Sequence, residues 1–201
     1  MAGLAANAQV AYAAVMEDGS DDDLMQRYAD GDATAFDVLY ERYKGPIYRY
    51  CLRHGPRVTA EEAHQEIWLA VISARESYVS EGRFRSWLFT LAHHTVINRN
   101  KAEMKHPATE DEPDIVPTES PVGGSDQDWQ QLQRYIRQLP LHQRDALMLQ
   151  HEGGFSLNEI ADITGTTKEG VKSRLRYAMS KLREQMQRWQ QEDEEVTHGR
   201  P

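Results

Sequence analysis

The chain has 201 residues, of which 39% are hydrophobic, and a formal net charge of −9 at pH 7. This length allows one medium domain or two small ones. No apolar run approaches the roughly 18 residues that a membrane-spanning helix needs, so the composition excludes an integral membrane protein. The single cysteine, Cys51, excludes an internal disulfide framework and indicates a cytoplasmic protein.

The N-terminal segment at 1–20 is rich in alanine and ends in acidic residues. It lacks the basic region that opens a secretory signal peptide, and Asn7 and Gln9 interrupt its apolar stretch. We therefore expect 1–20 to be a disordered tail.

The segment at 21–101 has apolar residues at helical spacing, and none of it alternates as a β-strand does. The positions that share this spacing are Leu24, Tyr28, Phe36, Leu39, Tyr40, Tyr43, Ile47, Phe84, Trp87, Leu88 and Leu91. The pattern predicts a small helical domain at 21–101.

Within that domain, the stretch TAEEAHQEIWLAVI at 59–72 predicts a helix with two apolar sides. One side, made of alanine, isoleucine and valine, suits the core of the domain. Trp68, Leu69 and Ile72 lie on the other side, among carboxylates and an amide, which is typical of a protein-binding patch. The alternative is that another helix of the same domain covers this second side.

The segment at 102–128 has the composition of a linker. Its central part, 107–124, contains four of the eight prolines and hardly any large apolar side chains, so it cannot form a packed core. The whole segment holds eight acidic side chains against one lysine. We expect a flexible acidic linker that competes with DNA for basic surfaces, so that the free protein binds DNA poorly.

The segment at 129–190 is the basic part of the chain, with ten basic and six acidic side chains. Ser156 precedes Glu159 by three residues, which is the spacing of a capping box at a helix start. Gly165 then ends that helix, and Thr166 with Glu169 repeats the capping spacing. Two capped helices around so short a turn predict a helix-turn-helix, followed by an acidic tail at 191–201.

The second helix of this motif has an apolar stripe through Val171 and Leu175 and a basic side opposite to it. The DNA major groove admits one helix, and Lys, Arg and Ser can reach its base-edge acceptors and flanking phosphates. The alternative is an amphipathic helix of a bundle with ordinary solvated charges. Because the turn, the caps and the charge agree, we favour DNA binding.

Several motifs, in this order, resemble sigma factors of the extracytoplasmic-function (ECF) group. The stretch at 59–72 resembles that family's polymerase-binding helix, and FRSWL at 84–88 resembles the start of its −10 helix. In the basic segment, LP at 139–140, VKSR at 171–174 and LR at 182–183 match the fourth conserved region. The resemblance implies an all-α protein of two domains that binds core RNA polymerase and promoter DNA.

The resemblance also implies two sets of contact residues. Those for the −35 element are Lys168, Lys172, Ser173, Arg174, Arg176 and Tyr177. Those for the clamp helices of the largest polymerase subunit are Glu61, Glu62, Gln65, Glu66 and Leu69.

For the −10 element, the family binds and melts DNA with an aromatic-containing loop and the helix after it. Melting needs a place for an unstacked base, and stacking on an aromatic side chain contributes about 1 to 3 kcal/mol per base. The predicted pocket is Tyr78, Val79, Ser80 and Glu81. The other predicted −10 contacts are Arg83, Arg85, Thr90, His94, Arg99 and Lys101. His93 and His94 stand where the family has an Arg-Asn pair, so the resemblance does not extend to the choice of −10 bases.

Other functions have less support. No nucleophile, base and orienting group form a set, and no glycine-rich loop follows a strand, so we expect neither an enzyme nor a cofactor. Neighbouring residues such as His93 and His94 diverge by about 100° on a helix, so we expect no metal site. Two rivals remain: a helix-turn-helix regulator that acts without polymerase, and a sigma mimic that sequesters an inhibitor. The resemblance also implies an anti-sigma factor as a partner.

Overall fold

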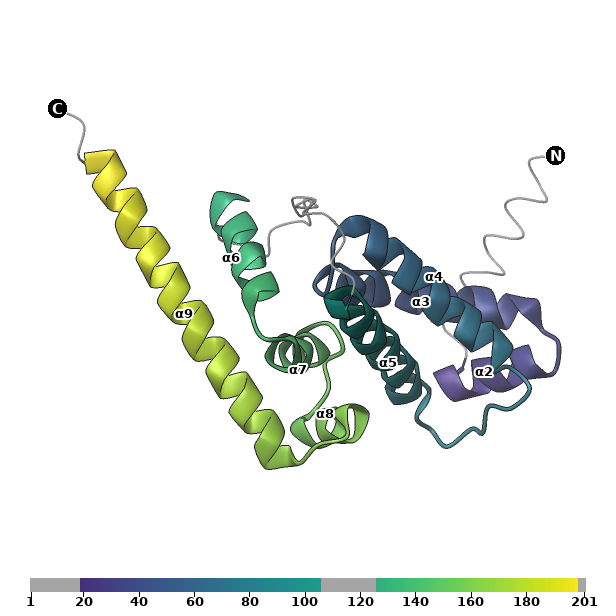
Figure 1. Cartoon of the computed structure of the whole chain (residues 1–201). Coiled ribbons are helices and arrows are strands. Elements are labelled where there is room, and N and C mark those ends of the chain that lie inside the picture. The colour runs from purple at the N-terminus through teal and green to yellow at the C-terminus, as the bar shows by residue number, and fades with distance from the viewer. Residues whose placement is uncertain (1–18, 106–125, 199–201) are drawn as a thin grey trace, which may run out of the picture.

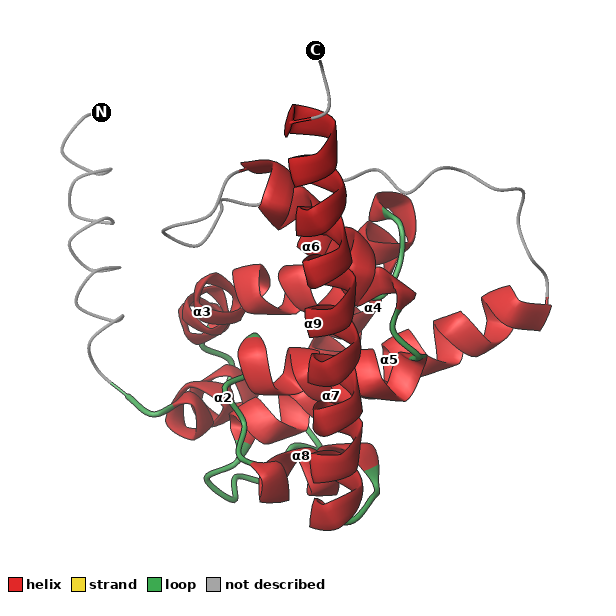
Figure 2. Ribbon diagram, turned by 90° about the vertical axis from the view of Figure 1, so that its left-hand side faces the viewer, coloured by secondary structure: helices red, strands yellow, loops and turns green. Residues whose placement is uncertain are grey.

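The computed structural model describes residues 19–105 and 126–198, and within these ranges the only regular secondary structure is the α-helix (Figure 2). The first range, the N-terminal half, contains α2 (Asp21–Ala29), α3 (Ala33–Leu52), α4 (Arg57–Ser73) and α5 (Phe84–Lys105). The second, the C-terminal half, contains α6 (Asp126–Gln138), α7 (Leu141–His151), α8 (Leu157–Thr164) and α9 (Lys168–His198). The all-α prediction is confirmed. The linker expected at 102–128 is helical at its described ends, because α5 continues through 102–105 and α6 begins at 126. The rest of that linker and most of the tail expected at 1–20 lie outside the described residues.

Short polar side chains set the starts of the first helices. Ser20 and Asp23 form a capping box at α2, in which the Ser20 hydroxyl accepts from the Asp23 backbone N–H at 3.2 Å. Asp32 caps α3 by accepting from the Thr34 backbone N–H at 3.0 Å. Each cap satisfies a backbone N–H that would otherwise be unpaired. These helices therefore begin where the sequence offers a side-chain oxygen as an acceptor.

The helix-turn-helix is formed by α8 and α9. Ser156 and Glu159 make the predicted capping box at α8, and Gly165 takes the left-handed conformation, with φ of 60°, that ends this helix. At α9, the Thr167 hydroxyl accepts from the Gly170 backbone N–H at 3.0 Å. The predicted capping box of Thr166 and Glu169 is therefore wrong. The capping residue is Thr167, directly before Lys168, and its hydroxyl pairs with the backbone N–H three residues later.

The last helix is longer than the predicted domain. It continues to residue 198, so the tail predicted at 191–201 is helical over most of its length. Before this extension, α9 contacts α6: the Trp189 indole N–H donates to Asp128 at 3.2 Å, and the Gln185 amide donates to Gln138 at 3.1 Å.

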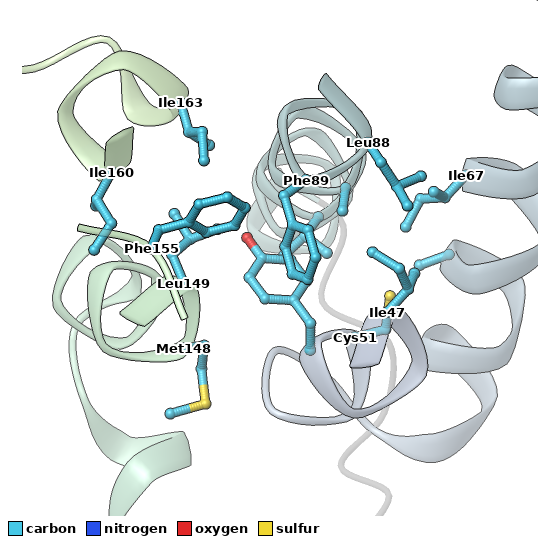
Figure 3. Close-up of a cluster of buried hydrophobic side chains, with 14 of the residues drawn as sticks. Ile47, Cys51, Ile67, Leu88, Phe89, Met148, Leu149, Phe155, Ile160 and Ile163 are labelled. Atoms are coloured by element: carbon cyan, nitrogen blue, oxygen red, sulfur yellow. The ribbon is translucent and has the colours of Figure 1, made fainter. Parts of the chain in front are cut away.

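The two halves pack against each other, with α5 facing α7 and α8 (Figure 1). Their buried apolar side chains form one continuous cluster. At its centre, the ring of Phe89 on α5 meets the ring of Phe155, just before α8, at 5.1 Å between centroids (Figure 3). Thus the helices predicted as separate domains share a core in this structure. Among the described helices, none has the length and apolar character needed to cross a membrane.

Candidate nucleic-acid interface

The basic side of α9 is exposed, as expected for a helix that enters a groove. Its apolar stripe is buried against α7 and α8 through Val171, Leu175, Ala178 and Leu182. On the opposite side the predicted contacts Lys168, Lys172, Arg176 and Tyr177 are exposed, whereas Ser173 and Arg174 are half-buried.

The interactions on this surface are weak ones. Lys172 Nζ lies 3.0 Å from Glu169 Oε1, and the Arg176 guanidinium lies 5.2 Å from the Tyr177 ring centroid. Exposed pairs of this kind contribute only about 0 to 1 kcal/mol and are screened by salt. DNA phosphates can therefore replace them at little cost.

A second candidate surface is the α4–α5 loop (residues 74–83), which is held by one carboxylate from α2. Asp22 Oδ1 accepts from the Tyr78 hydroxyl at 2.6 Å, the Ser80 hydroxyl at 3.3 Å and the Gly82 N–H at 3.1 Å. Its Oδ2 accepts from the Phe84 N–H at 3.1 Å. Asp22 therefore also pairs with a backbone N–H in the first turn of α5. Burial by itself raises the pKa of Asp22, but the hydrogen bonds outweigh it and lower the pKa.

The loop and α5 line a hollow of about 760 Å³ whose far side is α8. The predicted −10 residues along it are Tyr78, Val79, Glu81, Arg83, Arg85 and Thr90, and they face Glu159 and Asp162 of α8. Tyr78 packs edge-on against Trp87, with 4.9 Å between ring centroids. The structure therefore brings most of the predicted −10 set to one hollow.

The remaining −10 candidates lie elsewhere. Ser80 is in the loop but does not line the hollow, and His94 and Lys101 are exposed farther along α5. Arg99 contacts α4, with its Nε 2.8 Å from Glu66 and its Nη1 2.9 Å from Glu62. Arg99 thus joins the predicted polymerase-binding acids.

The outer side of α4 is a polar surface with two apolar side chains. The predicted contacts Glu61, Glu62, Gln65, Glu66 and Leu69 are all exposed. Leu69 is 62% exposed and Ile72 is 43% exposed. Trp68 was expected beside them, and this was wrong: it is 5% exposed because Tyr40 and Phe36 of α3 cover it, at 4.8 and 5.8 Å between ring centroids.

Comparison with known proteins identifies the two halves. The sigma-70 region 2 family matches residues 39–105, and the sigma-70 region 4 family matches residues 129–182. The chain belongs to the sigma-70 family. Similar proteins include the ECF RNA polymerase sigma factor ShbA of Streptomyces griseus, 28% identical over 177 residues that cover 80% of this chain and 92% of that one. The ECF sigma factor SigK of Mycobacterium tuberculosis is 29% identical over 174 residues, which cover 81% of this chain and 91% of that one.

Solved structures agree on the fold. The sigma factor RpoE of Bartonella quintana, in complex with the anti-sigma factor NepR, has a TM-score of 0.65 and 19% identity, covering 76% of this chain and 96% of that one. CnrH, in complex with the cytosolic domain of CnrY, has a TM-score of 0.60 and 19% identity. The match covers 82% of this chain and 95% of that one. The region 2 match contains α4 and α5, and the region 4 match contains the helix-turn-helix.

Sequence reasoning missed two residues of this sigma factor, Asp22 and Asp145. Asp22 was counted only as one acid of a charged N-terminal segment, although it organises the α4–α5 loop. Asp145 was counted only among the acids of the basic segment, yet it is fully buried between the halves. His54 and His93 both approach its carboxylate, and within the described ranges no cluster of side chains suits a metal ion.

Proposed function

We propose that this chain is an alternative sigma factor that binds core RNA polymerase, directs it to specific promoters and promotes initiation there. The observation that supports this best is the presence, in one chain, of a region 2 half and a region 4 half whose α9 exposes a basic side. Such a protein acts in the cytoplasm and is not an enzyme. Binding energy opens the DNA, without nucleotide hydrolysis.

The C-terminal half is proposed to anchor on duplex −35 DNA. α9 lies in the major groove, where the ammonium of Lys172 and the guanidinium of Arg176 donate to base-edge acceptors. Lys168, Ser173, Arg174 and Tyr177 contact the flanking backbone and bases. Phosphate contacts position the helix, and base contacts supply the sequence choice.

The N-terminal half is proposed to hold polymerase and the −10 strand. On α4, Leu69 and Ile72 are the apolar centre of the contact with the clamp helices, and the surrounding acids form its rim. At the α4–α5 loop, a flipped −10 base enters beside Tyr78, while Arg83 and Arg85 neutralise phosphates.

Reconstituted transcription tests the proposal. Core enzyme with this protein should initiate at a small set of promoters that core enzyme alone ignores, and the protein should comigrate with core enzyme. A helix-turn-helix regulator would instead shift its operator tightly without core enzyme, usually as a dimer. A sigma mimic would bind an inhibitor but give no promoter-specific transcript.

A protein inhibitor is a further proposed partner, because the structurally similar RpoE and CnrH are described in complexes, that of RpoE with an anti-sigma factor. A pull-down with the full-length chain from its own cells should recover such a protein in addition to polymerase. Recovery of polymerase alone would contradict this partner and leave the proposed function intact.

Lys172→Ala should weaken promoters in a base-dependent manner. Losing one good base contact costs about 1 to 3 kcal/mol, so the loss should be largest on the preferred −35 sequence and small on variants at the contacted position. Transcription from a panel of −35 variants measures this. Glu184→Ala, an exposed change farther along α9, is the control. A uniform loss across the panel would show that Lys172 contacts phosphate instead.

A further inference from the structure

The C-terminal half carries an apolar groove of about 430 Å³ between α6, α7 and α9, three helices that lie side by side in Figure 1. None of the predicted DNA or polymerase contacts lines this α6–α9 groove. Its apolar lining includes Trp129, Leu132 and Ile136 of α6, Met148 of α7, and Met179 and Met186 of α9.

Part of the groove wall lies beyond the family match. The region 4 match ends at residue 182, whereas Arg183 and Met186 of α9 also line the groove. This later part of α9 is held against α6 by the Gln185 amide, which donates to Gln138 at 3.1 Å. The continuation of α9 therefore completes a groove that the matched region alone would leave open on one side.

The apolar surface of the groove is partly exposed. Met179 is 48% exposed and Met186 is half-buried, although both lie among apolar side chains. Covering such a surface is favourable because it removes apolar area from water. Methionine side chains are flexible and polarisable, so they adapt to ligands of varied shape. The lining thus suits an apolar ligand.

The polar side chains of the groove favour an anion. Arg53, just after α3, and Arg183 of α9 are its two arginines, and α7 adds one histidine and one glutamine. No carboxylate is among the described residues that line it, although the chain has a net charge of −9. Arg183 is exposed, and the neighbouring Glu184 pairs with Arg188 instead. A negatively charged group can therefore approach Arg183 without displacing an ion pair of α9.

Arg53 brings a second positive charge to the apolar wall. It is only 4% exposed, and its guanidinium lies 5.6 Å from the ring centroid of Trp129. A guanidinium stays protonated even when it is buried. Because little water screens this charge, it attracts an anion in the groove more strongly than an exposed cation would.

The size of the groove indicates which kind of anionic, apolar ligand fits. Small-molecule sites in proteins have volumes of about 300 to 1,000 Å³, so 430 Å³ suits one small molecule. An α-helix about 10 Å across occupies roughly 400 Å³ per turn, so the groove has room for about one turn of a partner helix. Helices that dock in grooves use anchors spread over two turns. A single alkyl chain that ends in a carboxylate matches both the volume and the charges.

We propose that the α6–α9 groove binds a medium-chain fatty acid anion. The alkyl chain lies along Met179, Met186 and Trp129, and the carboxylate accepts from the guanidinium of Arg183. The site is separate from the DNA-reading side of α9 and from the exposed side of α4. Ligand binding here goes beyond the proposed function and does not depend on it.

A chain-length series tests the apolar part of the site. Calorimetric titration of the full-length protein would use octanoate, decanoate and dodecanoate, each below the concentration at which it forms micelles. Each added CH₂ should raise the affinity about two- to fourfold, because it buries further apolar area. Dodecyltrimethylammonium, with the same chain and a cationic head, should bind about fivefold more weakly than dodecanoate, or weaker still. Affinity that is independent of chain length, or equal for the two dodecyl compounds, would overturn the proposal.

Met179→Glu tests the location of the alkyl chain. A carboxylate in the groove should lower the affinity for dodecanoate about tenfold or more, because it must be desolvated beside the ligand. Ser180→Glu is the matched control, since it adds the same charge at the next position, which is exposed and does not line the groove. Its affinity should stay within about threefold of the wild type. Equal losses in the two variants would mean that the ligand responds only to the overall charge.

Arg183→Gln tests the head group. It should lower the preference for dodecanoate over dodecanol about three- to fivefold, since dodecanol has the same chain without the charge. Lys181→Gln removes a positive charge at an exposed position of α9 outside the groove and should leave this preference unchanged. The same preference in Arg183→Gln as in the wild type would rule out Arg183 as the carboxylate contact.

Methionine methyl resonances distinguish a specific site from unfolding by an amphiphile. In protein labelled at its methionine methyl groups, the signals of Met148, Met179 and Met186 should shift with the saturation seen by calorimetry. Met25, which is 0% exposed in the core of the N-terminal half, should keep its position. A shift of Met25 together with the groove methionines would show a general loss of packing and would contradict a site in the groove.

Discussion

Replacing Leu69 by aspartate should lower the affinity for core polymerase by about 30-fold or more, while leaving the fold unchanged. The fold is insensitive because the Leu69 side chain is 62% exposed and lies among polar neighbours on α4. The binding is sensitive because a leucine at the centre of a contact is desolvated, and a charge there costs about 2 kcal/mol or more. Titration of labelled core enzyme with each variant measures the affinity.

Val58→Asp is the matched control for Leu69→Asp. It introduces the same charge on the same helix at a side chain that is 69% exposed, before the expected contact residues begin. Its affinity should stay within about threefold of the wild type, as expected for a rim position. Equal losses for both variants would mean that charge on α4, and not a contact at Leu69, governs binding.

The arrangement of Arg99 refines this surface. Arg99 lies within 3 Å of both Glu62 and Glu66, so two of the acids expected to meet polymerase are already paired within the N-terminal half. Exposed pairs of this kind are weak and exchange readily. Arg99 can therefore hold the acids in register on α4 and release them to basic groups of a partner.

Local rules predicted much of this fold from the sequence. The spacing of Val171, Leu175 and Leu182 gave the buried stripe of α9, because helical periodicity depends on the chain alone. Likewise Ser156 and Gly165 marked the ends of α8, since caps are made by neighbours in sequence. The basic side of α9 followed from the same geometry.

Contacts between distant segments could not be predicted in this way. Tyr78 is 56 residues from Asp22, and Asp145 is 95 residues from Tyr50. A helical wheel gives the direction of a side chain but not what lies opposite to it, which is why Trp68 was placed on the open side of α4. For Asp145 the sequence carries no sign of burial, because an acid among basic residues is ordinarily solvated.

The largest effect on stability is expected at Asp22. Its carboxylate accepts from the Tyr78 hydroxyl and from two backbone N–H groups, those of Gly82 and Phe84. Asp22→Ala leaves these donors without their acceptor, and unsatisfied buried donors cost about 1 to 3 kcal/mol each. Water can reach the exposed Gly82 but not the buried Phe84, so we expect a loss of about 3 kcal/mol in the free energy of unfolding. Denaturant unfolding measures it.

A milder change, Asp22→Asn, should impair promoter opening while leaving the chain folded. Asp22 bonds the backbone of the α4–α5 loop, and we expect Tyr78 and Arg83 to stay at the hollow only while this carboxylate fixes the loop. Asp22→Asn keeps one acceptor oxygen and should fold, yet bind a single-stranded −10 oligonucleotide about tenfold more weakly in complex with core enzyme. Affinity for −35 duplex and for core enzyme should match that of Asp37→Asn, an exposed acid of α3. Normal −10 binding by Asp22→Asn would show that the loop is ordered without this carboxylate.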